Sequence, residues 1–216
     1  MARLFGTDGV RGEANAALCP ELAYRLGWAA ALYFGEKVQQ NPLIIIGRDT
    51  RISGNLFESA LATGICSAGG RVEIVGETYY HSLAFFYSRD EFQRQVDIHR
   101  QKIRDLFGVE ITAFRNTELS YNNELAEWSD QQGYKGIIAE GWDKVLGWRN
   151  ANYMYRPAGT KNVKLLLKNY RLSDDIAFRF SNRDWESYPL TSPTYVDWVD
   201  ASMGHDGAII NLFMDF

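Results

Sequence analysis

A chain of 216 residues is long enough for one full domain or two small ones. Its hydrophobic content of 46% and charged content of 23% are typical of globular proteins. The net charge of −4 excludes the basic surface expected of a protein that binds nucleic acid or an anionic membrane. Two cysteines are too few for a disulfide framework. The sequence shows neither a long apolar run nor the apolar core of a signal peptide, so we expect a soluble, cytoplasmic protein.

The composition changes near residue 70. Residues 1–70 carry six Lys/Arg and six Asp/Glu, so the net negative charge belongs to residues 71–216. Residues 71–216 also contain five of the six Trp and ten of the twelve Tyr. Aromatic rings fill cores and also stack on the apolar faces of sugars, and composition leaves both readings open. We predict a boundary between two unlike segments at this point.

The first segment has the pattern of a β-α-β unit. Pro20 suits the first position of a helix, which we expect over 20–36. The apolar run 43–46 predicts a buried strand. Ser53 is expected to cap a second helix that ends at two glycines, and a strand follows over 71–75. This order favours parallel strands with a right-handed crossover, so we expect strand 43–46 beside 71–75.

Strands and helices continue to alternate in the second segment. Ser88 is expected to cap a helix that ends at Gly108, and His99 lies on its apolar face as a structural residue. The apolar face of this helix is formed by Phe92, Val96, Ile103 and Leu106. The remaining expected elements are strands over 111–114, 135–139, 163–167, 176–180 and 208–214 and helices over 121–132 and 195–201. The alternation predicts an α/β fold with parallel strands.

Several predicted strands are followed by a carboxylate. These residues are Glu77, Glu118, Glu140 and Asp215. Parallel α/β barrels place their reacting groups at the carboxyl ends of the strands, where side chains from several strands converge. Polar residues also end strands at ordinary surfaces, so one such carboxylate indicates little. Four of them favour a shared acidic site, and glycoside cleavage uses two carboxyl groups, one ionised and one protonated.

Five stretches of the second segment identify a resemblance. They are VEIVGETYYHSLAFFYS (72–88), FRNTELSYNNELA (114–126), GYKGIIAEGWDKVLGWR (133–149), KNYRLSDDIAFRFS (168–181) and INLFMDF (210–216). With these, residues from about 70 to 216 resemble the α-amylase-type members of glycoside hydrolase family 57. The resemblance implies part of an incomplete (β/α)7 barrel and a retaining mechanism on α-glucans.

The same resemblance implies the site residues. Glu118, in FRNTEL, would be the nucleophile, and Asp215, in LFMD, would be the acid/base. The residues expected to line the substrate cleft are Glu73, His81, Arg115 and Trp142. For His81, a hydrogen-bonded core position explains the residue equally well. The three histidines lack the spacing of a metal site, so we expect no catalytic metal and no cofactor.

The first segment resembles a different family. The stretches LFGTDGVRG (4–12), PELAYRLG (20–27) and GRDTRISG (47–54) are similar to the start of bacterial phosphoglucosamine mutase. By this resemblance Arg11 would face the mutase active site and bind phosphate. The phosphoserine stretch and the magnesium-binding aspartate run of a phosphohexomutase do not occur in this sequence. Phosphoryl transfer therefore lacks its central group here.

The sequence thus predicts a chimera, with a phosphohexomutase-type unit over 1–70 and part of a hydrolase barrel over 71–216. Three functions stay open. The first is an α-amylase-like hydrolase of weak or no activity, because the barrel stretch is incomplete. The second is a mutase-type protein, and the third is a non-catalytic chimera, natural or made by an assembly join. We expect an α-glucan partner, no nucleic acid or membrane, and self-association through exposed strand edges.

Overall fold

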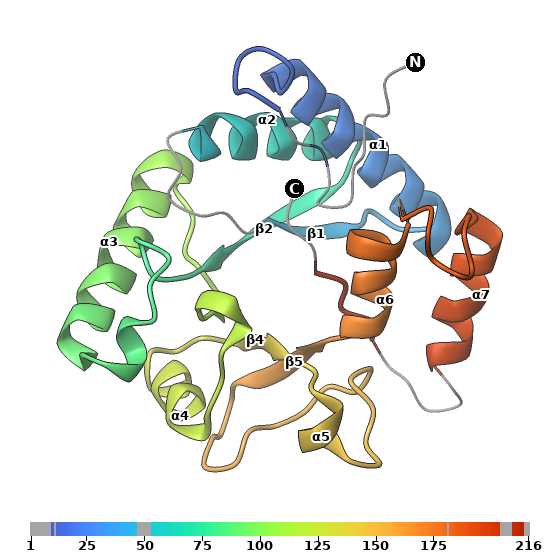
Figure 1. Cartoon of the computed structure of the whole chain (residues 1–216). Helices are drawn as coiled ribbons and strands as arrows, with labels where there is room; N and C mark the ends of the chain where they lie inside the picture. Colours follow the sequence, from blue (N-terminus) through green and yellow to red (C-terminus); the bar gives the residue numbers. More distant parts are fainter. Residues whose placement is uncertain (1–9, 11, 47–52, 181, 204–208, 214–216) are drawn as a thin grey trace. The chain divides into compact units, whose positions relative to one another are not determined.

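The computed structural model describes residues 10, 12–46, 53–180, 182–203 and 209–213. These residues divide into two compact units. The first unit is Gly12–Thr117, and the second unit is the described part of Met1–Arg11 and Glu118–Phe216. Figure 1 labels their helices and strands, and each unit is described by itself.

The first unit is an α/β arrangement of parallel strands. Its elements in chain order are α1 (Pro20–Val38), β1 (Leu43–Ile46), α2 (Gly54–Ser67), β2 (Arg71–Gly76), the 3-10 turn η1 (Ala84–Phe86), α3 (Arg89–Phe107) and β3 (Ala113–Arg115). Strand β1 pairs with β2 in parallel, with Leu43 opposite Arg71 and Ile46 opposite Ile74. Strand β2 pairs with β3 in parallel through Val75 and Ala113. The expected position of 43–46 beside 71–75 is therefore confirmed.

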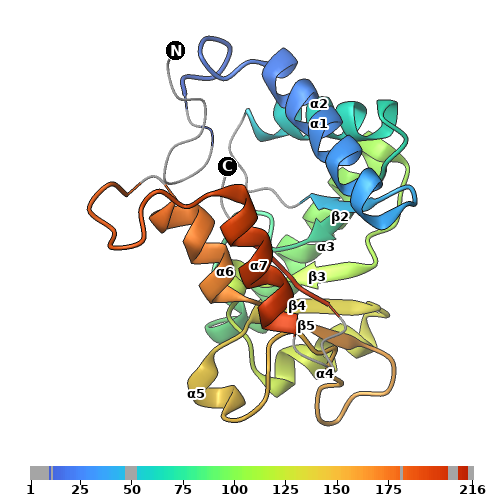
Figure 2. The same ribbon diagram turned by 90° about the vertical axis from the view of Figure 1, so that its right-hand side faces the viewer.

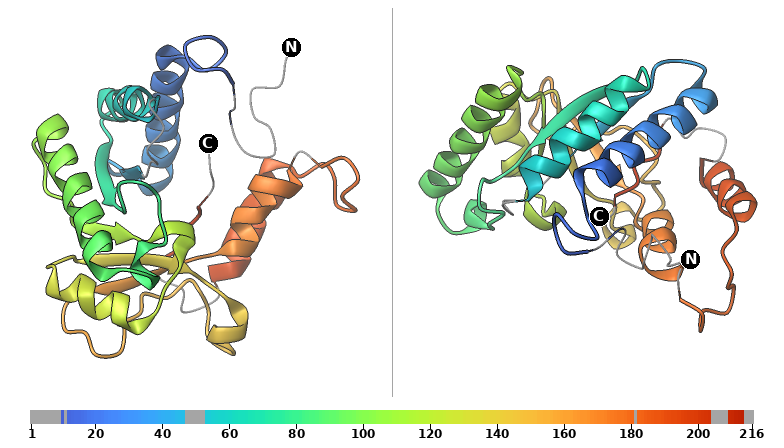
Figure 3. Two further views of the ribbon diagram at one scale, coloured as in Figure 1. Left: turned by 60° about the vertical axis from the view of Figure 1, so that its left-hand side comes forward. Right: turned by 90° about the horizontal axis from the view of Figure 1, so that it is seen from above.

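Helices α1 and α2 lie side by side and pack closely (Figure 3). A Cβ atom added at Gly64 of α2 would lie 2.0 Å from the backbone oxygen of Tyr24, and one at Gly27 of α1 would lie 2.2 Å from that of Leu61. Both glycines are required because the two backbones touch there. Ala31, Ile46 and Ile65 form the buried cluster that joins α1, β1 and α2.

Helix α3 begins and ends as its sequence predicts. The Ser88 side chain accepts a hydrogen bond from the Glu91 backbone N–H, and Gly108 ends the helix in the left-handed conformation, with φ of 66°. Phe92 of α3 packs edge-to-face on Phe85 and on Phe114 of β3, with ring centroids 5.0 and 5.9 Å away. Leu106 was expected in this apolar face but is exposed, because it lies in the last turn of the helix.

The second unit follows the same alternation. Its elements are α4 (Asn123–Gln131), β4 (Gly136–Glu140), α5 (Asp143–Leu146), β5 (Lys164–Lys168), α6 (Tyr170–Asp174), the π-helical turn η3 (Asp175–Arg179) and α7 (Ser192–Met203). A 3-10 turn, η2 (Thr117–Leu119), precedes them. Strands β4 and β5 pair in parallel from Gly136 opposite Lys164 to Glu140 opposite Lys168. Helices α6 and α7 are neighbours (Figure 2), and the Tyr195 hydroxyl donates to the Leu172 carbonyl.

Two loops of the second unit are held by polar side chains. The Asp130 carboxylate accepts hydrogen bonds from the backbone N–H groups of Lys161, Asn162 and Val163 at 2.8–2.9 Å. Asn152 is completely buried and donates to the Ser202 carbonyl at 2.7 Å. These bonds satisfy backbone groups that no strand or helix pairs.

Three local predictions differ from the structure. The predicted strand 176–180 is helical, because it continues α6, whose start is capped by Asn169 accepting from the Leu172 N–H. Residues 209–213 form a single parallel bridge, between Asn211 and Lys168, rather than a continuous strand. Ser53 precedes α2 but its side chain makes no capping bond, since its backbone is helical rather than extended. Among the described residues, no helix combines the length and apolarity that crossing a membrane requires.

Candidate functional site

The first candidate group lies where β3 ends. Asn116 and Thr117 are buried, the Glu118 side chain is exposed, and Leu119 is buried again. Glu118 has φ of 56° and Leu119 has φ of 53°, so two consecutive residues adopt the left-handed conformation. Side chains with a Cβ disfavour this region by roughly 1–2 kcal/mol per residue. Such strain persists where the surrounding structure imposes it, and it is concentrated at functional positions.

A buried carboxylate lies at the end of β2. Glu77 is only 4% exposed. The Nδ1 atom of His81 lies 3.4 Å from its carboxylate, and the Nη2 atom of Arg115 lies 4.0 Å away. His81 itself has a left-handed backbone, with φ of 50°. A buried carboxylate requires compensating partners, and here they are a histidine and an arginine that reach the surface in part.

Hydrogen bonds hold the turn that carries His81. The Glu77 backbone N–H donates to Nδ1 of buried His99 at 3.4 Å. The hydroxyls of Thr78 and Thr117 lie 3.1 Å apart, which links the turn to the residues after β3. The Ser82 hydroxyl donates to the Gln95 side chain at 2.8 Å. The expected structural role of His99 agrees with this buried position.

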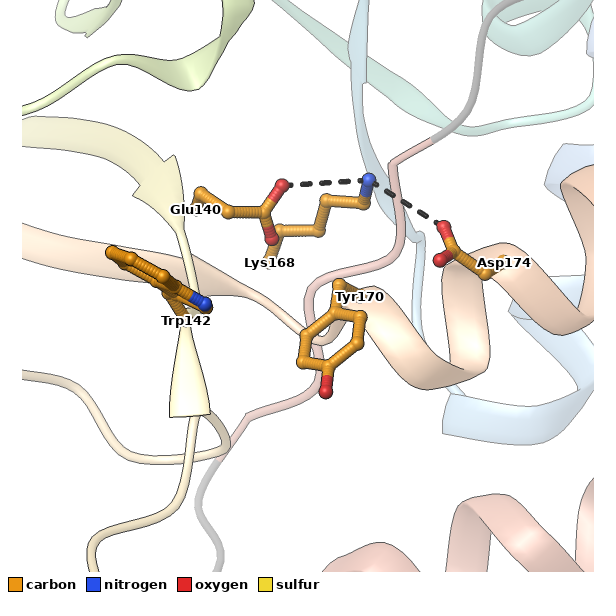
Figure 4. A pocket seen from close by; sticks show the side chains of 5 residues that line it. All are labelled: Glu140, Trp142, Lys168, Tyr170 and Asp174. Atoms are coloured by element: carbon orange, nitrogen blue, oxygen red, sulfur yellow. Dashed lines mark ion pairs between the residues drawn. The ribbon is translucent and has the colours of Figure 1, made fainter. Parts of the chain in front are cut away.

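The second candidate group is a pocket within the second unit (Figure 4). Its volume is about 260 Å³, and it is lined by Glu140, Trp142, Lys168, Tyr170 and Asp174. Glu140 and Lys168 are the last residues of β4 and β5 and stand opposite each other. The pocket therefore lies at the carboxyl ends of two parallel strands, the position at which α/β enzymes bind their ligands.

On the charged side of the pocket, one lysine forms ion pairs with two carboxylates. The Lys168 ammonium lies 3.6 Å from the Glu140 carboxylate and 3.9 Å from the Asp174 carboxylate. The aromatic side is fixed through Tyr170, whose hydroxyl donates to the Asp143 carboxylate at 2.9 Å. This bond, with that from Arg171, lowers the pKa of Asp143 below its usual value.

The structure brings some of the predicted residues together. His81 and Arg115 both face Glu77, and Trp142 lines the pocket of the second unit. Glu73 lies in the middle of β2, where its carboxylate accepts a hydrogen bond from the Thr112 hydroxyl. Asp215 and Arg11 lie outside the described residues.

Sequence reasoning missed most of the pocket. The sequence indicates Glu140 only as a carboxylate that follows a strand. Lys168 ends a strand in the same way, but glycoside cleavage uses carboxyl groups, so the pattern does not indicate a lysine. Tyr170 and Asp174 lie on α6, and no pattern marks their side chains as pointing toward Lys168.

Comparison with known proteins decides the family. Residues 61–216 match the model for glycosyl hydrolase family 57. The chain belongs to this family. A protein named "Putative alpha-amylase" from Methanocaldococcus jannaschii is 48% identical over 164 residues, covering 75% of this chain and 32% of that protein.

A second family overlaps the hydrolase match. Residues 2–98 match the model for the α/β/α domain I of phosphoglucomutase and phosphomannomutase. The phosphoglucosamine mutase of Natranaerobius thermophilus is 31% identical over 204 residues, covering 94% of this chain and 40% of that protein. The two matches confirm the predicted resemblance to two families. The chain spans less than half of the length of either curated relative.

Among solved structures, the 4-alpha-glucanotransferase from Thermococcus litoralis matches the fold of this chain. Its TM-score is 0.60 at 12% identity, and the match covers 89% of this chain and 28% of the glucanotransferase. At this identity the likeness concerns the fold alone. With the family match, it confirms the expected α/β fold of parallel strands as part of a (β/α) barrel of family 57.

Proposed function

We propose that this family 57 chain is a retaining glycoside hydrolase module for α-glucans, with Glu118 as nucleophile and Asp215 as acid/base. The observation that carries the proposal is the conformation of Glu118. An exposed carboxylate follows β3 between two buried residues, on a backbone that its side chain disfavours. The names of the Methanocaldococcus and Thermococcus relatives support an α-glucan as the substrate class.

In the proposed reaction the Glu118 carboxylate attacks the anomeric carbon while Asp215 donates a proton to the glycosidic oxygen. The carbon–oxygen bond breaks, and the glycosyl unit is held as an ester of Glu118. Asp215, now ionised, takes a proton from water, and the water oxygen attacks the anomeric carbon. The ester breaks and both carboxyl groups return to their starting states.

We assign the polar groups around Glu77 to substrate binding. His81 and Arg115 each approach this buried carboxylate and keep part of their side chains exposed. One end of each side chain is held near the carboxylate, and its other atoms stay accessible. This arrangement orients the side chain as a hydrogen-bond donor toward a hydroxyl group of a bound sugar. Glu73 is already hydrogen-bonded to Thr112, and we propose that it orients β2 and β3 rather than contacting the sugar.

We assign a structural role to the mutase-like segment. Strand β1 supplies the parallel neighbour of β2, and α1 and α2 bury the cluster of Ala31, Ile46 and Ile65. A strand without this neighbour would expose unpaired backbone groups. The described contacts of this segment thus explain its presence without phosphoryl transfer.

The test is an assay of the purified chain on maltooligosaccharides, with the Glu118→Gln and Asp215→Asn variants. General acid–base assistance contributes about 10²- to 10⁴-fold to rate, so we expect Asp215→Asn to lower kcat/KM by that factor. Glu118→Gln should lower it at least as much, since no glycosyl ester can form. The control is Glu124→Gln, which changes an exposed carboxylate of α4.

Retention of the wild-type rate by Glu118→Gln would refute the assignment of the nucleophile. Equal rates in all four proteins would show that the recognised carboxylates perform no chemistry in this chain. A fluorinated glucosyl substrate adds a second readout, because it should leave a glucosyl group on the peptide that contains Glu118. Modification of a different peptide would move the nucleophile elsewhere.

A further inference from the structure

Two buried hydroxyl groups join the turn of residues 78–82 to the segment that follows β3. Thr78 is completely buried and Thr117 is 3% exposed. The Thr117 hydroxyl donates to the Ser82 carbonyl at 2.9 Å, and the Ser82 backbone N–H donates to the Thr78 hydroxyl at 2.9 Å. The Thr78 and Thr117 oxygens lie 3.1 Å apart, so these three residues form a closed hydrogen-bond ring.

The number of protons fixes the direction of the hydrogen-bond ring. A hydroxyl has one proton to donate and two lone pairs that accept. The Thr117 proton is used on the Ser82 carbonyl, so the Thr78 proton is the one available between Thr78 and Thr117. The Thr78 oxygen lies farther, at 3.2 Å, from the Ser82 carbonyl. Each hydroxyl then donates once and accepts once, and hydrogen bonds in such a chain strengthen one another.

The hydrogen-bond ring adjoins two residues with a left-handed backbone. His81, with φ of 50°, immediately precedes Ser82, and Glu118, with φ of 56°, immediately follows Thr117. A residue with a Cβ keeps this conformation only where the surrounding structure imposes it. The ring fixes the neighbour of each of the two residues, so it supplies a common cause for both conformations.

Helix α3 holds the turn that contributes Ser82 to the ring. The Ser82 hydroxyl donates to Oε1 of Gln95 at 2.8 Å, and the Tyr80 backbone N–H donates to the same oxygen at 3.3 Å. The Gln95 amide donates in turn to the Glu91 carboxylate at 2.8 Å. Gln95 is 4% exposed and lies within a helix of 19 residues. The turn is therefore fixed to a regular element, which is a more precise support than a loop.

We infer that Thr117 is a positioning residue, whose hydroxyl sets the backbone of Glu118 and, through Ser82, that of His81. The inference rests on the proposed function, because it concerns the proposed nucleophile. A nucleophile reacts from a narrow range of positions, and a displacement of about 1 Å lowers a rate by about 100-fold. Thr117 needs no contact with the substrate for this role, since its hydroxyl acts within the buried ring.

The first experiment compares Thr117→Val with Thr117→Ser on maltooligosaccharides. Valine keeps the branched shape but removes the hydroxyl, so we expect kcat to fall by about tenfold to 100-fold while KM is unchanged. Serine keeps the hydroxyl and should restore most of kcat. The matched control is Ser129→Ala, which removes a buried hydroxyl that donates to the Leu125 carbonyl within α4 and should leave kcat unchanged.

The second experiment measures the backbone of Glu118 without any activity. Glycine adopts the left-handed conformation without the cost that a Cβ adds. Glu118→Gly should therefore raise the urea midpoint of the wild type, but give little or no gain in Thr117→Val, where the ring is broken. The control is Gln39→Gly, at an exposed left-handed residue after α1, which should raise both midpoints equally. If Thr117→Val does not fold, Thr78→Val breaks the same ring and replaces it in both experiments.

The outcomes separate this inference from the proposed function. A wild-type kcat in Thr117→Val would overturn the inference and leave Glu118 as the nucleophile. Equal midpoint gains from Glu118→Gly in the two backgrounds would overturn it as well. A wild-type chain without turnover would refute the proposed function, whereas the midpoints would still decide whether Thr117 sets the backbone of Glu118.

Discussion

The contacts that stabilise the interior of the first unit differ in kind from those that stabilise the interior of the second. In the first unit the backbones of α1 and α2 touch at Gly27 and Gly64, and phenylalanine rings join α3 to β3. In the second unit, Asp130 and Asn152 hold loops through hydrogen bonds from a side chain to the backbone. Apolar close packing tolerates little added volume, whereas a polar anchor tolerates volume but not the loss of its hydrogen-bonding atoms. Substitutions that add volume should therefore destabilise the first unit most, and substitutions that remove hydrogen-bonding atoms should destabilise the second.

The largest expected effect is in the contact of α1 with α2. Gly64→Val adds atoms where a Cβ would already lie 2.0 Å from the Tyr24 backbone oxygen. Backbone atoms cannot rotate away as a side chain does, so we expect a loss of at least about 3 kcal/mol in the free energy of unfolding. Urea denaturation measures the loss, and hydrogen exchange should show it concentrated in α1 and α2.

The control for this change is Gly35→Ala in the same helix pair. A Cβ at Gly35 would meet only Pro42 and Gln40, at 3.6 and 3.7 Å, which are ordinary contacts. Alanine is favoured over glycine in a helix by about 1 kcal/mol, so this variant should be as stable as the wild type or more stable. If Gly64→Val were as stable as Gly35→Ala, the close packing of the first unit would be disproved.

An intermediate effect is expected from Asn152→Ala in the second unit. The change removes the donor to the Ser202 carbonyl and the acceptor for the Asn169 side chain, at a completely buried position. An unsatisfied buried polar group costs about 1–3 kcal/mol. Asn162→Ala, at an exposed side chain, should change stability by less than about 0.5 kcal/mol. Equal denaturation midpoints for the two variants would contradict polar anchoring.

The smallest expected effect concerns Asp130 and depends on pH. Hydrogen bonds from the backbone N–H groups of Lys161, Asn162 and Val163 lower the pKa of this carboxyl below its usual 3.8. A carboxyl whose pKa is lower in the folded state stabilises the fold above its unfolded pKa and loses that contribution as pH falls through the folded value. Asp130→Asn should therefore lower the Tm at pH 7, and the difference from wild type should shrink below about pH 4. A Tm difference that is the same at pH 7 and pH 3 would show that the charge of Asp130 is not involved.

The sequence predicts much of the fold because local signals and burial agree in most elements. The apolar run Leu43–Ile46 is a strand from its first to its last residue, and Ser88 and Gly108 bound α3 as expected. The error at 176–180 has a physical reason. Its short alternation of apolar and polar residues resembles a strand, whereas the cap that makes the segment helical, Asn169, lies seven residues earlier in the chain.

The candidate site was less predictable because its contacts join residues far apart in the chain. The strand-end rule found Glu77 and Glu140, and the family resemblance found His81, Arg115 and Trp142. Neither source indicates that Arg115 lies near Glu77, from which it is 38 residues distant in the sequence, or that Lys168 lies between two carboxylates. The left-handed backbone of Glu118 also has no sequence signal, since glycine or asparagine would be expected there.

The pairing of β1 with β2 bears on how genes recombine. The ladder between the two strands is made of backbone N–H and C=O groups, which every residue except proline supplies in full. The two family matches overlap over residues 61–98, and that range contains all of β2. A crossover between unrelated coding sequences can keep such a ladder, provided that each side contributes an extended apolar strand and a helix of suitable length. Junctions inside β-α-β units are therefore places where reading frames from different ancestors can be exchanged with little structural loss.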